Sequence, residues 1–191
     1  MLMENNLKPK ELVNVADFGI KGINYYWTRR ERFEISLEEL KSAGVNNGNA
    51  YLSWNIIEPL KKANKELKKY QMELIVKDAY RSPELCKLIQ KKRYKVRGKE
   101  ETDQLINMER MPHSTGLAVD VGLIDLKTGE ELKMRNADDD PEAFFVDFYK
   151  NKKDANSREF QRLQDVLIRT MKSVGFTIGS KSEFWHFEWK K

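Results

Sequence analysis

The sequence predicts an α+β fold, with a central antiparallel sheet flanked by helices in a single domain. Short apolar runs typical of buried strands occur at 72–76, 117–126 and 176–178. Residues 127–130, Lys-Thr-Gly-Glu, are typical of a hairpin turn, and 157–174 carry an apolar face at helical spacing. Strands joined by turns and kept apart from the helices favour antiparallel pairing.

Apolar residues at helical spacing define the predicted helices. Pro59 lies inside the first of them and should kink it. Ser82 and Pro83 are a typical N-cap and first residue of the second. Asn156 or Ser157 is the expected cap of the last. In chain order the predicted helices cover 51–70, 83–92, 100–110, 141–149 and 157–174.

Apolar stretches between turn signals define the predicted strands. The hairpin turn at 127–130 predicts a return strand after it, and 112–116 is a turn by composition. The predicted strands cover 13–18, 72–76, 117–126, 131–134, 176–178 and 183–189. We therefore expect one domain over 1–191, with its core in 72–189 and an N-terminal segment, 1–50, of less regular pattern.

The charge is modestly basic, with 35 Lys and Arg against 30 Asp and Glu, a net +5. Basic runs at 61–69 and 91–99 are typical of a solvated helix face and an exposed loop, although a nucleic-acid-binding surface stays open. No stretch approaches the roughly 18 apolar residues of a membrane span. Residues 1–27 lack the apolar stretch of a signal peptide. We expect a cytoplasmic protein, or a periplasmic one if a leader was removed.

Cysteine and histidine are scarce enough to restrict the possible chemistry. Cys86 is the one cysteine, which excludes an internal disulfide and a zinc site built from two or four thiolates. His113 and His186 are the two histidines, which excludes a three-histidine metal site within one chain. Any chemistry that needs an imidazole must use one or both of these residues.

Asp120 and the two histidines are a candidate ligand set for a metal. Asp120 lies between Val119 and Val121 in a predicted strand, so its carboxylate should be partly buried and needs a partner or a metal. With His113 and His186 it supplies two nitrogens and one oxygen, which suits an open catalytic zinc site and also other divalent metals. The alternative, that each histidine is merely packed or hydrogen-bonded, stays open at this point.

Three segments together resemble a known enzyme family. His113-Ser-Thr-Gly-Leu-Ala-Val-Asp120, followed by Glu183-Phe-Trp-His186-Phe, resembles the motifs of the zinc DD-peptidases of the M15 family. Asp78-Ala-Tyr-Arg81, which follows a predicted strand, matches a further family segment in type and order. The closest likeness is to the D-alanyl-D-alanine dipeptidase branch, over about 74–189.

The resemblance implies a zinc dipeptidase with one zinc ion per chain. His113, Asp120 and His186 would be the ligands, Glu183 the general base, and Arg81 the group that stabilises the oxyanion. Zinc lowers the pKa of its bound water toward about 7, and a carboxylate beside that water can take its proton. The expected reaction is hydrolysis of a small D,D-dipeptide by that water, without a covalent intermediate.

The identity of the base is ambiguous from strand geometry alone. In a regular strand Glu183 and His186 point to opposite faces, whereas Glu188 shares a face with His186. Glu188 is therefore a rival base, and its alternative role is a salt-bridging carboxylate behind the ligand. The family pattern favours Glu183, which requires a bend between 183 and 186.

Substrate contacts are predicted from the same resemblance. A dipeptidase must bind a free amino terminus, and Asp139 is the expected carboxylate for it; a solvated turn is the alternative. Tyr80 and Ser114 are expected to line the pocket, and Asp78 to orient Arg81. The family often has a serine where this chain has Met111, and this departure leaves substrate choice open.

Two rival functions follow. Within the family, a DD-carboxypeptidase or L,D-endopeptidase would act on longer peptidoglycan peptides. In another class, the chain would be a non-catalytic module, stabilised by a metal or binding nucleic acid through the 91–99 run. The presence of both Glu183 and Arg81 favours an enzyme, so the expected partner is a small D,D-dipeptide or wall peptide, with no nucleic acid and no membrane.

Overall fold

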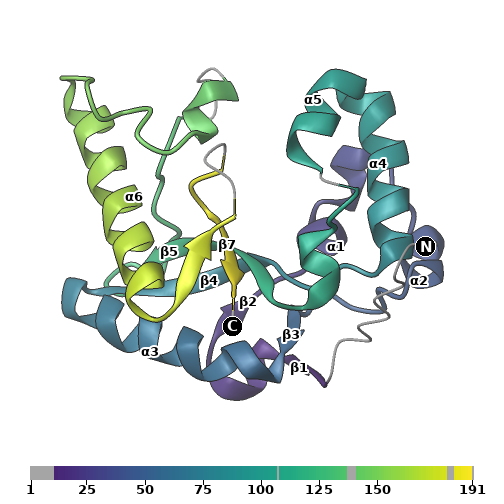
Figure 1. Ribbon diagram of the computed structural model, residues 1–191, viewed down its shortest axis with the longest axis horizontal. Helices are drawn as coiled ribbons and strands as arrows, with labels where there is room; N and C mark the ends of the chain where they lie inside the picture. The colour runs from purple at the N-terminus through teal and green to yellow at the C-terminus, as the bar shows by residue number, and fades with distance from the viewer. Residues whose placement is uncertain (1–10, 107, 137–140, 180–182, 191) are drawn as a thin grey trace.

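The structure, a computed structural model, describes residues 11–106, 108–136, 141–179 and 183–190 (Figure 1). Its strands are β1 (Leu12–Asn14), β2 (Lys21–Gly22), β3 (Tyr51–Ser53), β4 (Met72–Asp78), β5 (Ala118–Asp125), β6 (Phe176–Ile178) and β7 (His186–Trp189). Its α-helices are α1 (Tyr25–Thr28), α2 (Leu37–Ser42), α3 (Ile57–Leu67), α4 (Pro83–Arg97), α5 (Lys99–Leu105) and α6 (Ala155–Ser173).

Five strands form the main sheet, in the order β2-β4-β5-β7-β6, and β1 pairs with β3 in a separate two-stranded sheet. Neighbouring strands of the main sheet are antiparallel, except that β2 runs parallel to β4. The predicted α+β class and central antiparallel sheet are therefore confirmed, with one short parallel strand added at an edge.

Alternation along the strands separates an apolar face of the sheet from a polar one. Successive strand residues point to opposite faces, so Val119 and Val121 of β5 enter the core while Asp120 points the other way. Helices α3 and α6 pack on the apolar face with residues at helical spacing: Ile57, Leu60, Ala63, Leu67, Leu163, Val166, Leu167 and Met171. Each large aliphatic side chain buried there contributes about 1.5–3 kcal/mol.

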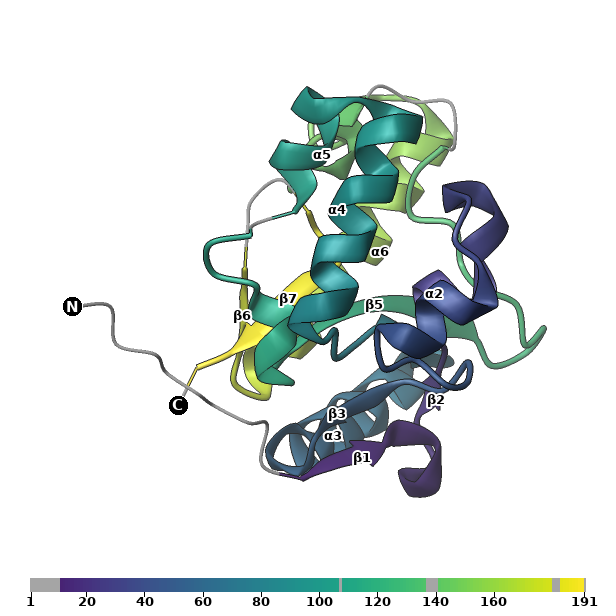
Figure 2. The same ribbon diagram turned by 90° about the vertical axis from the view of Figure 1, so that its right-hand side faces the viewer.

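A second apolar cluster holds α4 in place. It joins Leu85 and Ile89 of α4 to Tyr26, Phe33 and Leu40 from the N-terminal third of the chain. The α4–α5 pair stands on the opposite side of the molecule from α6 (Figure 1), with α2 beside α4 (Figure 2). The irregular N-terminal segment thus anchors a helical wall.

The helix predicted over 51–70 is wrong at its start. Residues 51–53 form β3 because they pair with β1, and a short 3-10 turn leads into α3. Pro59 lies in the first turn of α3, where backbone N–H groups have no intrahelical acceptor, so the reason for a kink disappears. The loop expected at 91–99 is also wrong, because α4 continues to Arg97.

Two elements predicted after β5 are shorter than expected. The return strand at 131–134 is reduced to one bridge, between Ile124 and Glu131, and the Met134 carbonyl accepts a hydrogen bond from Gln164 of α6. The helix expected over 141–149 is a 3-10 turn at Pro141–Phe144, and Asp147, with φ 69°, has a backbone conformation that cannot continue a helix.

The predicted cap of α6 is corrected by two or three residues. Asp154, rather than Asn156 or Ser157, is the N-cap, and its carboxylate accepts a 2.8 Å hydrogen bond from the Ser157 backbone N–H. Asp154, Asn156 and Ser157 are all residue types that cap helices well. Composition alone therefore did not distinguish them.

Much of the positive charge is paired on helix surfaces, as expected for solvated faces. The lysines and arginines of the two basic runs that form ion pairs, with their partners, are Lys61–Glu58, Lys69–Glu66, Lys92–Glu39, Arg97–Glu101 and Lys99–Asp103. Apart from Lys92, whose side chain is 14% exposed, these are exposed or half-exposed pairs, which contribute little to stability. Among the described helices, none is long and apolar enough to cross a membrane.

Candidate active site

Strand register brings three of the predicted residues into one row across the polar face. Asp120 on β5 is paired with Asp78 on β4 and with His186 on β7. A register shift between Val76 and Asp78 lets Asp78 take this place. Residues that are 66 apart in the sequence therefore become direct cross-strand neighbours, and the His186 Nδ1 lies 2.8 Å from the Asp120 Oδ1.

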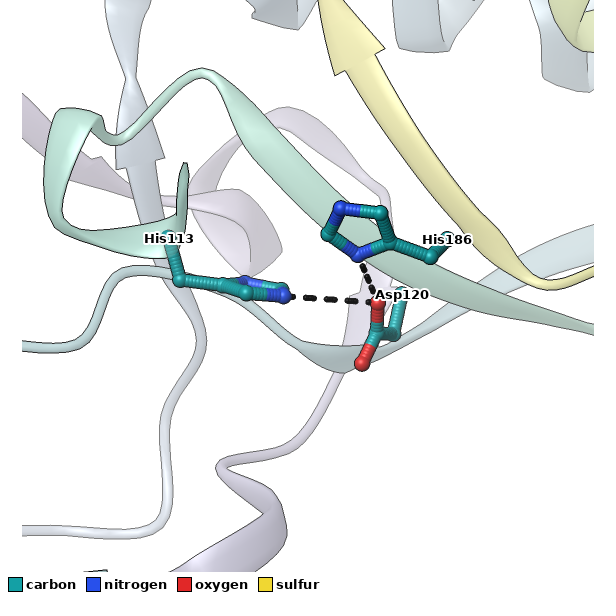
Figure 3. Close-up of side chains that lie close together, drawn as sticks. All are labelled: His113, Asp120 and His186. Carbon is teal, nitrogen blue, oxygen red and sulfur yellow. Dashed lines mark hydrogen bonds and ion pairs between the residues drawn. The ribbon is translucent and has the colours of Figure 1, made fainter. Parts of the chain in front are cut away.

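His113 reaches the same carboxylate from the 3-10 turn that precedes β5. Its Nδ1 lies 2.8 Å from the Ala79 carbonyl oxygen, which can only accept, so Nδ1 carries the ring proton. Nε2, the other ring nitrogen, faces Asp120 Oδ1 at 3.4 Å (Figure 3). Met111, where this turn begins, has φ 40°, a left-handed conformation that is uncommon for a non-glycine residue.

These three side chains fit a metal ion by their chemistry. One ligand atom from each of His113, Asp120 and His186 lies within 4.8 Å of the others, and both rings are buried. Burial opposes the charge on Asp120, but the two histidines hold the pKa of its carboxyl well below the usual range. Two imidazoles and an ionised carboxylate are the donor set of open zinc sites, and the Ala79 carbonyl supplies the outer contact that fixes one ring.

Arg81 is held rigidly beside the cluster. Its Nε and Nη2 donate to Asp78 Oδ2 at 3.0 and 2.6 Å, and its guanidinium lies over the Tyr26 ring at 5.3 Å. Burial disfavours its charge, yet Asp78 keeps the pKa of Arg81 above its ordinary value. Nη2 also lies 3.8 Å from Asp120 Oδ2. The arrangement presents a fixed positive charge at the edge of the ligand cluster.

Glu183 lies outside the regular strand. The chain turns at 184–185 and β7 begins at His186, whose N–H donates to the Glu183 carbonyl. The strict alternation that would have put Glu183 on the wrong face therefore does not apply. Burial, together with the nearby Asp120 carboxylate, raises the pKa of Glu183 to about 7.

Glu188 has different surroundings. It is buried on β7, on the same face as His186, and its Oε2 accepts a 2.6 Å hydrogen bond from Arg110 Nη2. Its Oε1 lies 3.7 Å from His186 Nε2. Glu188 also lines the cavity, but an ion-paired carboxylate beside the ring fits the salt-bridging alternative better than the role of a base.

A cavity of about 430 Å³ opens over the cluster. Its floor includes Arg81, His113, Asp120, Glu183 and His186. One side is formed by α4, α5 and the segment that follows them, with the lining residues Cys86, Gln90, Asp103, Ile106, Met108, Glu109 and Arg110. In Figure 1 this side corresponds to the helices standing across from α6. Gln90, Asp103 and Arg110 have no distinctive sequence neighbourhood, and sequence reasoning missed them.

The predicted substrate contacts differ in where the structure places them relative to the cavity. Asp78 contacts Arg81, as described. Tyr80 and Ser114 are not among the described residues that line the cavity, and the Ser114 hydroxyl donates to the Arg81 carbonyl at 2.7 Å. Ser114 therefore supports the backbone that carries Arg81. Asp139 lies outside the described residues.

A comparison with protein-family models gives one match. Residues 49–191 match the M15 peptidase family, described as D-Ala-D-Ala dipeptidase. The match covers more than half of the chain and includes every residue of the metal cluster. No curated protein is significantly similar to the chain in sequence.

Solved structures of three proteins resemble the chain. The vancomycin-resistance D,D-dipeptidase VanXYg, in complex with a D-Ala-D-Ala phosphinate analogue, has a TM-score of 0.53 at 18% identity and covers 97% of this chain. The D,D-pentapeptidase VanY, in complex with Zn(II), has a TM-score of 0.48 at 17% identity, covering 76% of this chain and 75% of VanY. The LD-carboxypeptidase LdcB has 0.45 at 18% identity, covering 73% of this chain. The chain spans 57% of VanXYg and 59% of LdcB.

Proposed function

The chain belongs to the M15 family of zinc metallopeptidases, and from that premise we propose that it is a D-alanyl-D-alanine dipeptidase. Its substrate is a small D,D-dipeptide with a free amino terminus. The observation that carries this proposal is the convergence of His113, Asp120, His186, Glu183 and Arg81 on the floor of one cavity. The proposal assigns each of them one task in peptide hydrolysis.

We assign the metal to His113, Asp120 and His186. His113 is oriented as a ligand needs, since its Nδ1 proton is engaged by Ala79 and Nε2 is the nitrogen that faces the cluster. Bound there, zinc supplies a Lewis acid that activates water and polarises a carbonyl. A set of three protein ligands leaves room for both.

Glu183 is the proposed general base. It removes a proton from the attacking water and passes that proton to the amine that leaves when the peptide bond breaks. A group with a pKa of about 7 is well suited to both transfers, because it is neither strongly acidic nor strongly basic at neutral pH. Its position before β7, rather than within it, lets it face the cavity.

Arg81 is the proposed electrophilic partner. Its guanidinium donates toward the substrate carbonyl oxygen as negative charge develops there, an effect of about 3–4 kcal/mol for one donor. Asp78 and Tyr26 hold this side chain in place from two sides. A donor that is already oriented loses little free energy to reorganisation during the reaction.

Recognition of the substrate's ammonium group is assigned to Asp139. A carboxylate at the pocket mouth would make a charge-assisted hydrogen bond to that group. This is the element of the proposal that separates a dipeptidase from its relatives, since an acylated peptide has no ammonium group to offer.

A second candidate, a DD-carboxypeptidase or L,D-endopeptidase acting on peptidoglycan peptides, is favoured by the extent of the cavity. The lining continues from the metal cluster to Gln90, Asp103 and Ile106 on the α4–α5 side, which offers contacts to residues beyond a dipeptide. A dipeptidase would act on free dipeptide in the cytoplasm, the compartment we propose. The second candidate would act on the wall or its fragments.

Hydrolysis of free and N-acetylated D-Ala-D-Ala by the zinc-loaded protein tests the proposal. We expect cleavage of the free dipeptide, little cleavage of the acetylated one and none of L-Ala-L-Ala. Glu183→Gln should retain zinc and lower kcat by roughly 100- to 10,000-fold. Glu159→Gln, an exposed change on α6, is the matched control. Equal cleavage of free and acetylated dipeptide would favour the second candidate.

A further inference from the structure

We propose that Glu188 is a positioning residue that holds His186 in the tautomer and orientation needed for metal binding. Arg110 holds Glu188, and Gly179 provides the space in which the ring lies. The inference rests on the proposed function in one respect, namely that His186 is a zinc ligand. Neither Arg110 nor Gly179 belongs to the motifs that the sequence singled out.

The two nitrogens of His186 face different carboxylates. Nδ1 lies 2.8 Å from Asp120 Oδ1, inside the ligand cluster. Nε2, on the other side of the ring, lies 3.7 Å from Glu188 Oε1. If Nδ1 is to offer its lone pair to a metal, the ring proton must be on Nε2, and a carboxylate facing Nε2 favours that tautomer. Glu188 thus has the same part for His186 as the Ala79 carbonyl has for His113, but it acts electrostatically from 3.7 Å and not through a 2.8 Å hydrogen bond.

Glu188 is itself held by a charged partner. Its side chain is 10% exposed, and a buried carboxylate without compensation is unfavourable. Arg110 Nη2 donates to Oε2 at 2.6 Å, which leaves Oε1 as the oxygen nearer to His186. The carboxylate thus bridges Arg110, on the cavity wall, to the proposed ligand on the cavity floor.

Gly179 leaves the space in which the His186 ring lies. A Cβ at this position would lie 2.3 Å from His186 Cδ2 and 2.8 Å from Glu188 Oε1, both far inside van der Waals contact. The φ angle of Gly179 is not positive, so glycine is required here for space and not for backbone conformation. The Gly179 N–H also donates to the His186 carbonyl at 3.1 Å, which fixes the backbone that carries the ring.

Zinc affinity, measured by chelator competition, tests this role without depending on activity. We expect Glu188→Ala and Gly179→Ala to weaken zinc binding by roughly 10- to 100-fold. Glu188→Gln should weaken it less, because its amide oxygen can still accept from Nε2–H. Glu73→Ala is the matched control, since Glu73 is a strand carboxylate, 15% exposed, paired with Lys21 and away from the cavity. It should leave the affinity within about twofold.

A second readout reports the ring directly. The chain has two histidines, so ¹⁵N NMR of tag-free protein resolves both imidazoles. In the zinc-loaded wild type we expect the proton of His186 on Nε2, and in Glu188→Ala a mixture of tautomers. This measurement applies equally to Glu188→Gln and Gly179→Ala if Glu188→Ala fails to fold.

Two results would overturn the inference. One is unchanged zinc affinity and tautomer in folded Glu188 and Gly179 variants. The other is loss of hydrolysis in Glu188→Gln at wild-type zinc affinity, which would make Glu188 a base. Failure of the wild type to bind zinc would instead refute the proposed function, so the two failures are distinguishable.

Discussion

At the residue scale, the surroundings of two neighbouring carboxyl groups shift their pKa values in opposite directions. Asp120 faces two imidazoles, which hold the pKa of its carboxyl well below the usual range despite burial. Burial raises the pKa of Glu183 to about 7, and the Asp120 charge adds to that effect. Asp120 therefore stays ionised, as a metal ligand should, whereas Glu183 has a pKa at which it can gain and lose a proton near neutral pH. Environments that separate two pKa values in this way commonly mark an acid–base site.

The raised pKa of Glu183 predicts a pH-dependent cost to stability in the metal-free protein. On folding, Glu183 takes up a proton between its unfolded pKa, near 4.5, and about 7. Its contribution is therefore fully present at low pH and is lost as the pH rises through 7. Glu183→Gln should stabilise the metal-free protein at pH 8 by on the order of 3 kcal/mol and have little effect at pH 4.5.

Urea unfolding in the presence of a chelator measures this difference. Glu66→Gln on α3, which removes an exposed carboxyl, is the control, and it should change the free energy of unfolding by less than about 0.5 kcal/mol at either pH. An equal effect of Glu183→Gln at both pH values would show that the pKa of Glu183 does not change on folding, which would contradict the raised value.

Sequence reasoning identified the residues that converge on the cavity floor but not those that hold them. His113, Asp120 and His186 were accessible because their motifs resemble a family pattern. Arg110 lies 78 residues from Glu188, and no local sequence pattern predicts that the two side chains form an ion pair. Gly179 matters because it leaves space for the His186 ring, and the need for that space arises only from tertiary packing.

At the scale of elements, the register of β4, β5 and β7 builds the site. The Asp78–Asp120–His186 row depends on a register shift in β4. Arg81 then follows in the short segment before α4, so the start of α4 determines where Arg81 lies. Ser82 caps this helix, accepting from the Leu85 N–H at 3.0 Å and donating to the Ala43 carbonyl at 2.7 Å.

The Ser82 cap predicts a measurable loss. Ser82→Ala removes both hydrogen bonds and should lower the free energy of unfolding by about 1–2 kcal/mol, measured by urea denaturation. Ser173→Ala, which removes an exposed hydroxyl bonded to the Thr170 carbonyl, should cost less than about 0.5 kcal/mol. Equal losses in the two variants would contradict the assigned role of the cap.

Elements with strong local signals were predictable, and those defined by distant partners were not. Ser82 and Pro83 predict the start of α4, and the apolar periodicity of 157–174 predicts α6. By contrast, 51–53 resembles the start of a helix until β1 pairs with it. After the single bridge at Glu131, the chain that follows β5 bonds to a later helix, through Gln164 and the Met134 carbonyl.

At the scale of the whole molecule, the two faces of the sheet have different roles: one packs against the core helices, and the other carries the candidate active site. One face is covered by α3 and α6 and is apolar, and the other carries the titratable cluster beneath the cavity. The described part of the N-terminal third, from residue 11 on, contributes no residue to the cavity lining, yet it packs against α4 and so supports one wall. Stability therefore comes mainly from one side of the sheet, which leaves the other free to place charged groups close together.

The central claim is that His113, Asp120 and His186 form one zinc site on the open face of the sheet. The most direct measurement is the zinc content of the purified wild type beside Asp120→Ala, both dialysed against a weak chelator, with circular dichroism to verify folding. The account predicts about one zinc ion per wild-type chain and almost none in the variant. A folded wild type without zinc, or a variant that keeps a full equivalent, would contradict it.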